Sequence, residues 1–232
     1  MRVCIIPARG GSKRIPRKNI KDFLGKPMIG YSIEAALKSE CFDKVIVSTD
    51  DQEIAQIAKT FGAEVPFMRP DELANDHAGT LPVIKHAIEW FEEHIRKPSE
   101  VCCLYATAPF VQADSIKQAY KQLQTTQADY CFSVTSFAFP IQRAIKITQH
   151  QRIEMFYPEH LNTRSQDLEE AYHDAGQFYW GKTEAFKQLK PLFFENASPF
   201  LLPRYLVQDI DTQEDWLRAE MMYQLLIKTG KL

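Results

Sequence analysis

The segment VCIIPARGGSKRIPRKN (residues 3–19) joins a short apolar run to a loop that contains a Gly-Gly pair and many basic residues. The apolar run Val3–Pro7 predicts a buried strand. Seven basic residues precede the first acidic residue, Asp22: Arg2, Arg9, Lys13, Arg14, Arg17, Lys18 and Lys21. In open α/β sheets, ligands lie outside the carboxyl ends of the strands. The basic loop is therefore placed where an anionic ligand would bind.

The rest of the chain alternates between short apolar runs and amphipathic segments. Further strands are expected at 44–49, 63–68 (weakened by its proline), 101–108, 130–137, 175–181 and 199–211. Helices are expected at 28–37, at 51–62 with Asp50 or Asp51 as the cap, at 80–95 with Thr80 as the cap, at 114–124, and after a cap at Thr212 with Asp215 three residues on. This alternation predicts an α/β fold, in which one doubly wound, mostly parallel sheet carries helices on both faces. We expect a single domain spanning residues 1–232.

Residues 140–170 interrupt the alternation. They mix polar and aromatic residues and have weak helical periodicity. This pattern is typical of a small β-rich insertion or arm, which often serves dimerisation or substrate capture. An irregular connection would account for it equally well.

The composition is that of a soluble globular protein, with 45% hydrophobic residues, 25% charged residues and a net charge of −2. Because the positive charge is local, we expect a small anionic partner and no nucleic acid. The five cysteines lack C-x-x-C spacing and predict reduced thiols in the core of a cytoplasmic protein. No run approaches the roughly 18 apolar residues of a membrane span, so no membrane contact is expected.

The loop is not one of the familiar phosphate-binding motifs. It contains neither G-x-x-x-x-G-K-[ST] nor G-x-G-x-x-G, which excludes a P-loop and the dinucleotide fingerprint. Glycines nevertheless let backbone N–H groups approach a phosphate, and Lys and Arg neutralise its oxygens. A strand followed by Ala-Arg-Gly-Gly-Ser-Lys and Pro-Arg-Lys-Asn favours phosphate binding over a solvated surface turn.

The sequence PARGGSKRIPRKN (7–19) resembles the signature of the sugar-acid cytidylyltransferases, which make CMP-sialic acid and related CMP-nonulosonates. Two later blocks resemble the same family in the same order: VIVSTDDQEIAQIAKTFGAEVPFMRPDELANDHAGT (45–80) and DIDTQEDW (209–216). The resemblance covers nearly the whole chain. It implies a nucleotide-diphospho-sugar-transferase-like, Rossmann-type fold and a homodimer.

Two further segments depart from the sialic acid enzymes of that family. Where those enzymes typically read Leu-Gln-Pro-Thr-Ser-Pro, this chain reads LYATAP (104–109), with Ala106 in place of the glutamine. Where they carry an Asn-Gly pair, this chain reads YHDAGQFYW (172–180). With TRSQDLEE (163–170), these departures resemble the branch that acts on pseudaminic acid. An enzyme for sialic, legionaminic or Kdo acid is the nearest alternative.

The resemblance implies that the anomeric hydroxyl of a nine-carbon keto-sugar acid attacks the α-phosphorus of CTP, giving CMP-sugar and pyrophosphate. The implied CTP-binding residues are Arg9, Ser12, Lys13, Lys18, Asn19, Arg69 and Thr80. Lys18 and Arg9 would stabilise charge on the phosphate, because phosphoryl transfer depends mostly on positioning and charge neutralisation. Arg14 and Arg17 could instead be solvated.

Asp209 and Asp211 are the expected ligands of Mg²⁺, with Asp211 also assigned a catalytic role through a metal-bound water. At strand spacing their side chains would point to the same face. Alternatively, Asp209 ends a strand and Asp211 only precedes the cap of the last helix.

The expected sugar-binding residues are Arg164, Gln177, Phe178 and Tyr179. A guanidinium such as Arg164 or Arg143 could pair with the sugar carboxylate. Core packing is an equally good account of Phe178. A catalytically silent nucleotide-binding regulator is the alternative from a different class, but Lys18 and both aspartates are present.

Overall fold

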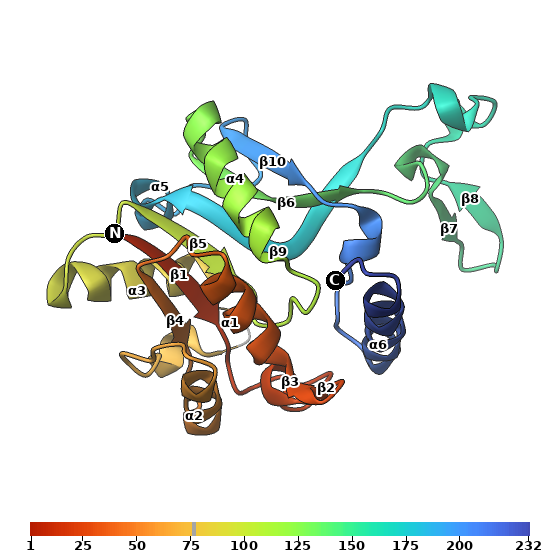
Figure 1. Ribbon diagram of the computed structural model, residues 1–232. Helices are drawn as coiled ribbons and strands as arrows, with labels where there is room; N and C mark the ends of the chain where they lie inside the picture. Colours follow the sequence, from red (N-terminus) through yellow and green to blue (C-terminus); the bar gives the residue numbers. More distant parts are fainter. Residues whose placement is uncertain (76–77) are drawn as a thin grey trace.

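The computed structural model describes residues 1–75 and 78–232. Its centre is a six-stranded sheet with the order β10-β6-β9-β5-β1-β4 (Figure 1). The strands are β1 (Arg2–Pro7), β4 (Lys44–Ser48), β5 (Glu100–Leu104), β6 (Tyr130–Ser136), β9 (Tyr172–Lys182) and β10 (Ala197–Leu201). β1 pairs in parallel with β4 and β5, β10 pairs in parallel with β6, and β9 runs antiparallel between β5 and β6. The expected mostly parallel sheet is confirmed.

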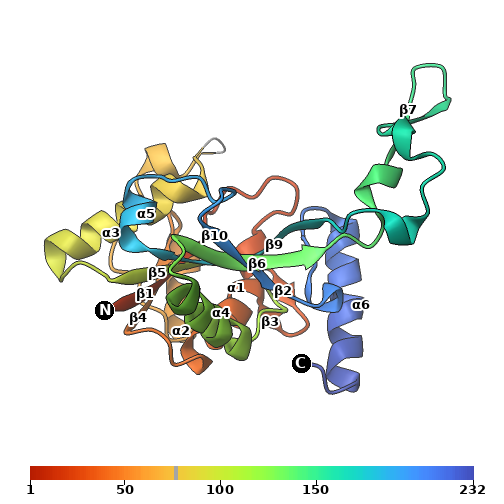
Figure 2. The ribbon, with the colours of Figure 1, turned by 90° about the horizontal axis from the view of Figure 1, so that it is seen from above.

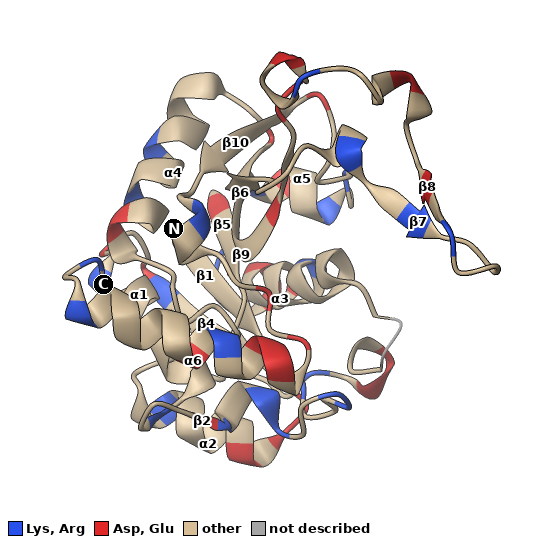
Figure 3. Cartoon of the chain, turned by 90° about the vertical axis from the view of Figure 1, so that its right-hand side faces the viewer, with Lys and Arg blue, Asp and Glu red and all other residues tan. Residues whose placement is uncertain are grey.

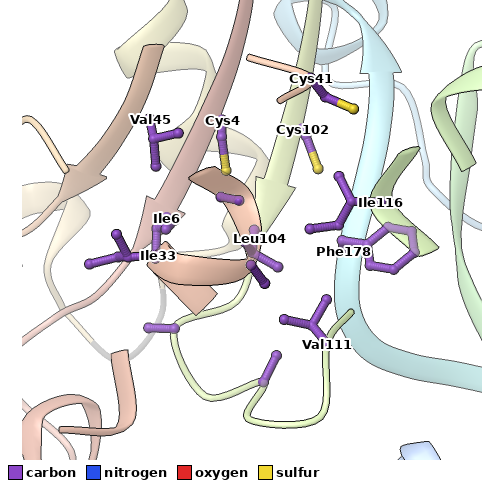
Figure 4. Close-up of a cluster of buried hydrophobic side chains, with 14 of the residues drawn as sticks. Cys4, Ile6, Ile33, Cys41, Val45, Cys102, Leu104, Val111, Ile116 and Phe178 are labelled. Carbon is purple, nitrogen blue, oxygen red and sulfur yellow. The ribbon is translucent and has the colours of Figure 1, made fainter. Parts of the chain in front are cut away.

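Helices cover both faces of this sheet. They are α1 (Met28–Lys38), α2 (Gln52–Thr60), α3 (Thr80–His94), α4 (Ala113–Thr126), α5 (Thr183–Lys187) and α6 (Gln213–Lys228). On one face Cys4 and Ile6 of β1 pack in a cluster with α1, α2 and α4 (Figure 4). On the other face Val3 and Ile5 pack with α3 and α5. Because both faces are buried, the strands have continuous apolar sequences instead of alternating ones.

The five cysteines are all buried and form no disulfide. Cys4, Cys41 and Cys102 lie in the cluster of Figure 4. Burial raises the pKa of the Cys131 thiol to about 12. The expectation of reduced core thiols is confirmed.

Two strand expectations were wrong. Residues 63–68 form only isolated bridges, Ile46 to Glu64 and Thr49 to Met68, because Pro66 between them has no N–H to donate. The strand expected at 199–211 ends at Leu201, and Pro203 starts a 3-10 turn, η6 (Arg204–Leu206). Asp209 and Asp211 therefore lie on an irregular segment, and the strand-spacing argument does not apply to them.

Helix caps follow the sequence at two of three expected positions. Asp51 caps α2 by accepting from Ile54 N, and Thr212 forms a capping box with Asp215 on α6. Thr80 is instead the first residue of α3, with Gly79 at the cap position. Its hydroxyl is hydrogen-bonded to another side chain, described below.

Residues 137–171 form an arm that leaves the ends of β6 and β9 and projects away from the sheet (Figures 1 and 2). The arm contains an antiparallel hairpin of β7 (Ile145–Ile147) and β8 (Ile153–Met155). Its other regular elements are the 3-10 turns η3 (Ile141–Arg143), η4 (Pro158–His160) and η5 (Ser165–Asp167). The expected arm is present, although only its hairpin is β-structure.

A third apolar cluster brings the C-terminal part of the chain to the loop after β1. The short strands β2 (Asp22–Phe23) and β3 (Lys26–Pro27) follow that loop. Phe23 packs edge-to-face on Trp216 of α6 at 5.5 Å, and Ile210 is buried in the same cluster. Residues 209–211 are thereby held beside the basic loop. No helix in the described part of the chain is long and apolar enough to cross a membrane.

Candidate active site

The basic loop lies at the carboxyl end of β1 and is tied down by backbone contacts. Gly10 N donates to Asp50 Oδ1 at 3.0 Å, and Asn19 Nδ2 donates to the carbonyl oxygen of Arg9 at 2.9 Å. A Cβ on Gly10 would come within 2.8 Å of Asp51 Oδ2, so this close approach requires glycine. The loop geometry therefore depends on the first residues after β4 as well as on its own sequence.

Arg17 fastens the other side of the loop to the start of α2. Its backbone has a positive φ of 57°, and Nη2 donates to Asp51 Oδ1 at 3.0 Å. The Arg17 guanidinium holds the pKa of Asp51 down at about 2. From the sequence, Arg17 could have been solvated. In the structure it forms ion pairs with Asp51 and with the exposed Glu53.

A cavity of about 280 Å³ opens above the carboxyl ends of β1 and β5. It is lined by Pro7, Arg9, Ser12, Arg14, Lys18, Asn19, Arg69, Ala78, Gly79, Thr80, Val83, Tyr105, Ala106, Thr107 and Asp211. Arg9, Arg14 and Lys18 come from the basic loop and Arg69 comes from the segment after α2, while the uncharged Ala78, Gly79 and Val83 come from the start of α3 and the residues just before it. We call this cavity the cationic pocket.

Six of the seven residues expected to bind CTP line the cationic pocket. They are Arg9, Ser12, Lys18, Asn19, Arg69 and Thr80. The seventh, Lys13, lines an adjoining cavity of about 310 Å³ together with Arg9, Ser12 and Lys18. These seven residues come from two of the sequence blocks, and Asp211, which lines both cavities, adds the third.

Lys18 and Asp211 face each other across the mouth of the pocket. Lys18 Nζ donates to the carbonyl oxygen of Ile210 at 2.6 Å and lies 3.3 Å from Asp211 Oδ1. Arg14 Nη2 lies 2.8 Å from Asp211 Oδ2, so Arg14 contributes to the site although its side chain is 67% exposed. These contacts connect the loop to the C-terminal acidic segment.

Arg69 supplies a buried cation. Its side chain is only 6% exposed, and its guanidinium donates to the hydroxyl of Ser48 at 3.1 Å and to the Ser48 carbonyl oxygen. Burial lowers the pKa of Arg69 to about 10, which leaves it charged at neutral pH. A charged group already held by Ser48 can attract an anion without paying much rotamer entropy.

A larger cavity of about 610 Å³ adjoins the cationic pocket and shares Tyr105 and Thr107 with it. Its other lining residues are His173, Asp174, Ala175, Gly176, Tyr179, Val207, Gln208, Asp209 and Arg218. We call it the second pocket. It lies where the first residues of β9 meet the segment before α6.

Hydrogen bonds run along the wall between the two pockets. The hydroxyls of Thr80 and Tyr105 are 3.0 Å apart, and Tyr179 donates to Asp174 Oδ2 at 2.5 Å. Asp174 Oδ1 also accepts from Gly176 N at 2.8 Å. Burial raises the pKa of Tyr179, so it stays a donor at neutral pH. The sequence did not predict this wall, because their residue types alone do not distinguish Tyr105 and Asp174 from packing residues.

Asp211 lines the cationic pocket and Asp209 lines the second pocket, and the two carboxylates are close enough for their charges to interact. Burial, and then the charge of Asp211, raise the pKa of Asp209. Two repelling carboxylates beside a cationic pocket are a donor set that suits Mg²⁺, which takes one or two carboxylates with waters and phosphate oxygens. Within residues 1–75 and 78–232 no group of three His, Cys, Asp or Glu side chains could form an all-protein metal site.

The expected sugar-binding residues do not come together. Tyr179 lines the second pocket. Gln177 is buried and donates to the carbonyl oxygen of Leu206, and Phe178 has no exposed surface, which favours the core-packing alternative for Phe178. Arg164 lies on the arm and pairs with Asp167 at 2.6 Å, and Arg143 donates to arm carbonyl oxygens. Neither arginine lines a described cavity.

Comparison with known proteins finds a matching family model, similar sequences and a similar solved structure. A family model described as cytidylyltransferase matches residues 3–230. A pseudaminic acid cytidylyltransferase of Campylobacter jejuni is 48% identical over 223 residues, which cover 96% of each chain. An N-acylneuraminate cytidylyltransferase of Escherichia coli is 32% identical, over 96% of this chain and 52% of that protein. A CMP:2-keto-3-deoxy-manno-octonic acid synthetase solved in complex with CTP is similar in fold, with a TM-score of 0.68 and 18% identity over 97% of this chain and 98% of that one.

Proposed function

Because this chain belongs to the cytidylyltransferase family, we propose that it transfers CMP from CTP to the anomeric hydroxyl of pseudaminic acid, with release of pyrophosphate. The choice of acid is supported by the 48% identity with a pseudaminic acid enzyme, against 32% with an N-acylneuraminate enzyme. The substitution at Ala106 and the block 172–180 favour the same acid.

The cationic pocket is the observation that carries this proposal. Arg9, Arg14 and Lys18 of the basic loop line it with Arg69, and the start of α3 adds the uncharged Ala78, Gly79 and Val83. A nucleoside triphosphate combines the matching parts, an uncharged nucleoside and a highly charged phosphate chain. The triphosphate would therefore lie on the loop and the nucleoside against the start of α3.

The reaction forms one bond and breaks one bond at phosphorus. The anomeric oxygen bonds to the α-phosphorus, the bond from that phosphorus to the β-phosphate oxygen breaks, and the hydroxyl proton passes to solvent or a nearby base. Negative charge on the phosphoryl oxygens must be stabilised throughout. Lys18, anchored by Ile210 at 2.6 Å, and Arg9 supply that stabilisation.

Asp209 and Asp211 are the residues that would hold Mg²⁺. The metal, when bound, would neutralise phosphate charge and lower the pKa of a bound water. Asp211 already lies between Lys18 and Arg14, so its carboxylate also orients the cations of the loop.

The acceptor sugar would occupy the second pocket. That pocket adjoins the cationic pocket through Tyr105 and Thr107, and its volume of about 610 Å³ is within the range of ligand sites. We place the reaction in the cytoplasm, where the buried thiols stay reduced. We further propose a homodimer in which the arm contacts a second copy, as argued in the Discussion.

The test is pyrophosphate release with Mg²⁺, using CTP, UTP, ATP and GTP against pseudaminic, N-acetylneuraminic and Kdo acids. We expect release with CTP and pseudaminic acid. Replacing Lys18 by Met should lower kcat about 100- to 1,000-fold, the usual cost of losing one preorganised charge donor. Lys121→Met, on the exposed side of α4, is the matched control and should leave kcat unchanged.

Release with CTP and a different acid would overturn the substrate but keep the chemistry. If the folded protein binds CTP but releases no pyrophosphate with any of the acids, the proposed function is contradicted.

A further inference from the structure

The acceptor proposed above imposes a requirement that the loop residues do not meet. In a 2-keto sugar acid the anomeric carbon carries both the attacking hydroxyl and the carboxylate. A cation that holds the carboxylate must therefore lie in the acceptor pocket, close to the attacking oxygen. Resting on the proposed function, we infer that Arg218 of α6 is this cation.

Among the described residues that line the second pocket, Arg218 is the only Lys or Arg. The carboxylates of Asp174 and Asp209 line the same pocket and would repel an acid unless a cation offsets them. No ion pair joins Arg218 to any residue in the described chain, although its charge contributes slightly to lowering the pKa of Asp215. Its five-donor guanidinium is thus available, and its planar fork matches a carboxylate.

The backbone around Arg218 is rigidly placed. Trp216 and Ala219 on either side are buried in the third apolar cluster. The N-terminus of α6 is fixed by the capping box, in which Asp215 Oδ2 accepts from Thr212 N at 2.8 Å and from Asp211 N at 3.1 Å. The helix that presents Arg218 to the second pocket is therefore the same helix that fixes Asp211 beside Lys18.

The arginines of the arm are less suited to this role within one chain. Arg164 is held by Asp167, with Nε and Nη2 at 2.6 and 3.2 Å from the two carboxylate oxygens. Arg143 donates to the carbonyl oxygens of Leu161 and Thr163. Either would have to give up these contacts to bind an acid.

The experiment compares pseudaminic acid with its C1 carboxamide in wild type, Arg218→Gln, Arg218→Lys and Arg164→Gln. Wild type should prefer the acid, and Arg218→Gln should raise KM for the acid about 10- to 100-fold, the range of a charge-assisted hydrogen bond. KM for the carboxamide should change little, because an amide lacks the charge that Arg218 recognises. Arg218→Lys should recover part of the loss, and KM for CTP should stay the same throughout.

Arg96→Gln, an exposed arginine in the loop before β5, is the control for loss of one surface charge and should match wild type. Equal loss for acid and carboxamide in Arg218→Gln would overturn the inference and assign Arg218 a structural role. Loss of acid preference in Arg164→Gln instead would overturn it in favour of the arm.

Equilibrium binding of the acid, measured by calorimetry in the presence of CMP, separates the inference from the proposed function. Binding that weakens in Arg218→Gln, with no turnover by wild type, would support the inference and contradict the reaction. Turnover by wild type, with binding unchanged in Arg218→Gln, would support the reaction and contradict the inference.

Discussion

Asp209 is a residue whose charge opposes folding and serves the site. Partial burial and the neighbouring carboxylate of Asp211 raise its pKa in the folded protein above its ordinary value. A raised pKa means that the folded state binds the proton more tightly than the unfolded state, so the ionised carboxylate lowers stability once the pH exceeds both pKa values. The retention of such a carboxylate is consistent with a metal-binding role.

We therefore expect Asp209→Asn to change stability and activity in opposite directions. At pH 7 its Tm should rise by about 1–2 °C, since a gain below 1 kcal/mol shifts the Tm of a chain of this size by a few degrees at most. The gain should vanish near pH 3, where wild type is also protonated, while kcat at pH 7 falls at least about 10-fold. Thermal unfolding at the two pH values and pyrophosphate release are the measurements. Glu195→Gln, on an exposed loop, should show neither effect, and a lower Tm for Asp209→Asn at pH 7 would contradict the argument.

The residues of the cationic pocket could be predicted from the sequence because their type and order restrict them strongly. A loop with Arg9, Lys13 and Lys18 after a strand has few other uses, and these residues do line adjoining cavities. The second pocket could not be predicted in the same way. Tyr105 and Arg218 are 113 positions apart in the sequence, and their meeting in one cavity depends on how α6 packs on Phe23.

At the scale of elements, the loop after β1 and the start of α2 form one unit. Asp51 caps α2 through Ile54 N at 2.9 Å and also holds Arg17 of the loop. Asp50 holds Gly10 N at 3.0 Å. The sequence predicted the cap, but it could not show that the same carboxylate binds a residue 34 positions earlier.

This double role predicts a pH-dependent stability. The pKa of Asp51 falls from 3.8 to about 2 in the folded protein, so its contribution is present above pH 4 and is lost as the pH falls toward 2. Asp51→Asn keeps a capping oxygen but loses the charge. It should lower the free energy of unfolding by about 1–2 kcal/mol at pH 7, after discounting for partial exposure, and by much less at pH 2.

Urea unfolding at pH 7, 4 and 2 measures this difference. Glu53→Gln is the matched control, because Glu53 binds the same arginine but is 65% exposed, so its removal should cost less than about 0.5 kcal/mol. A difference between Asp51→Asn and wild type that persists at pH 2 would show that the ion pair with Arg17 is not its source.

The elements themselves were predicted well where apolar runs are short and uninterrupted. β4 and α1 lie close to their expected bounds, because the apolar run of β4 and the helical spacing of apolar residues in α1 are both clear. The antiparallel direction of β9 was not predictable, since an apolar run between a projecting arm and a short helix carries no signal of direction. Proline explains both wrong strand predictions. Pro66 removes an N–H within 63–68, and the chain turns at Pro203.

At the scale of the whole molecule, the arm has one apolar face that nothing in residues 1–75 and 78–232 covers. In the hairpin Ile145 pairs with Met155 and Ile147 with Ile153, so these four side chains share one face. Ile147 and Ile153 are 70% and 69% exposed. The opposite face carries the ion pair of Lys146 and Glu154 at 3.1 Å, and Figure 3 shows the basic position on β7 and the acidic one near β8.

Such alternation is typical of a strand pair that is buried on one side and solvated on the other. Because the arm extends away from its own sheet (Figure 2), we expect another molecule to cover its apolar face. A second copy of the chain is the simplest partner, since a two-fold axis would bury the same face of both arms.

The last prediction tests this assembly. Changing both Ile147 and Ile153 to Lys should raise the dimer dissociation constant more than roughly 100-fold, because each isoleucine contributes about 1.5–3 kcal/mol when buried. Sedimentation velocity at micromolar concentration should show a dimer for wild type and a monomer for the variant, with an unchanged far-UV spectrum because both side chains are exposed in one chain. The charge reversal Lys146→Glu with Glu154→Lys keeps the ion pair on the opposite face and should remain dimeric. A monomeric wild type would refute the dimer, and a variant that stays dimeric would move the interface to another surface, such as the exposed Leu217, Met221 and Leu225 of α6.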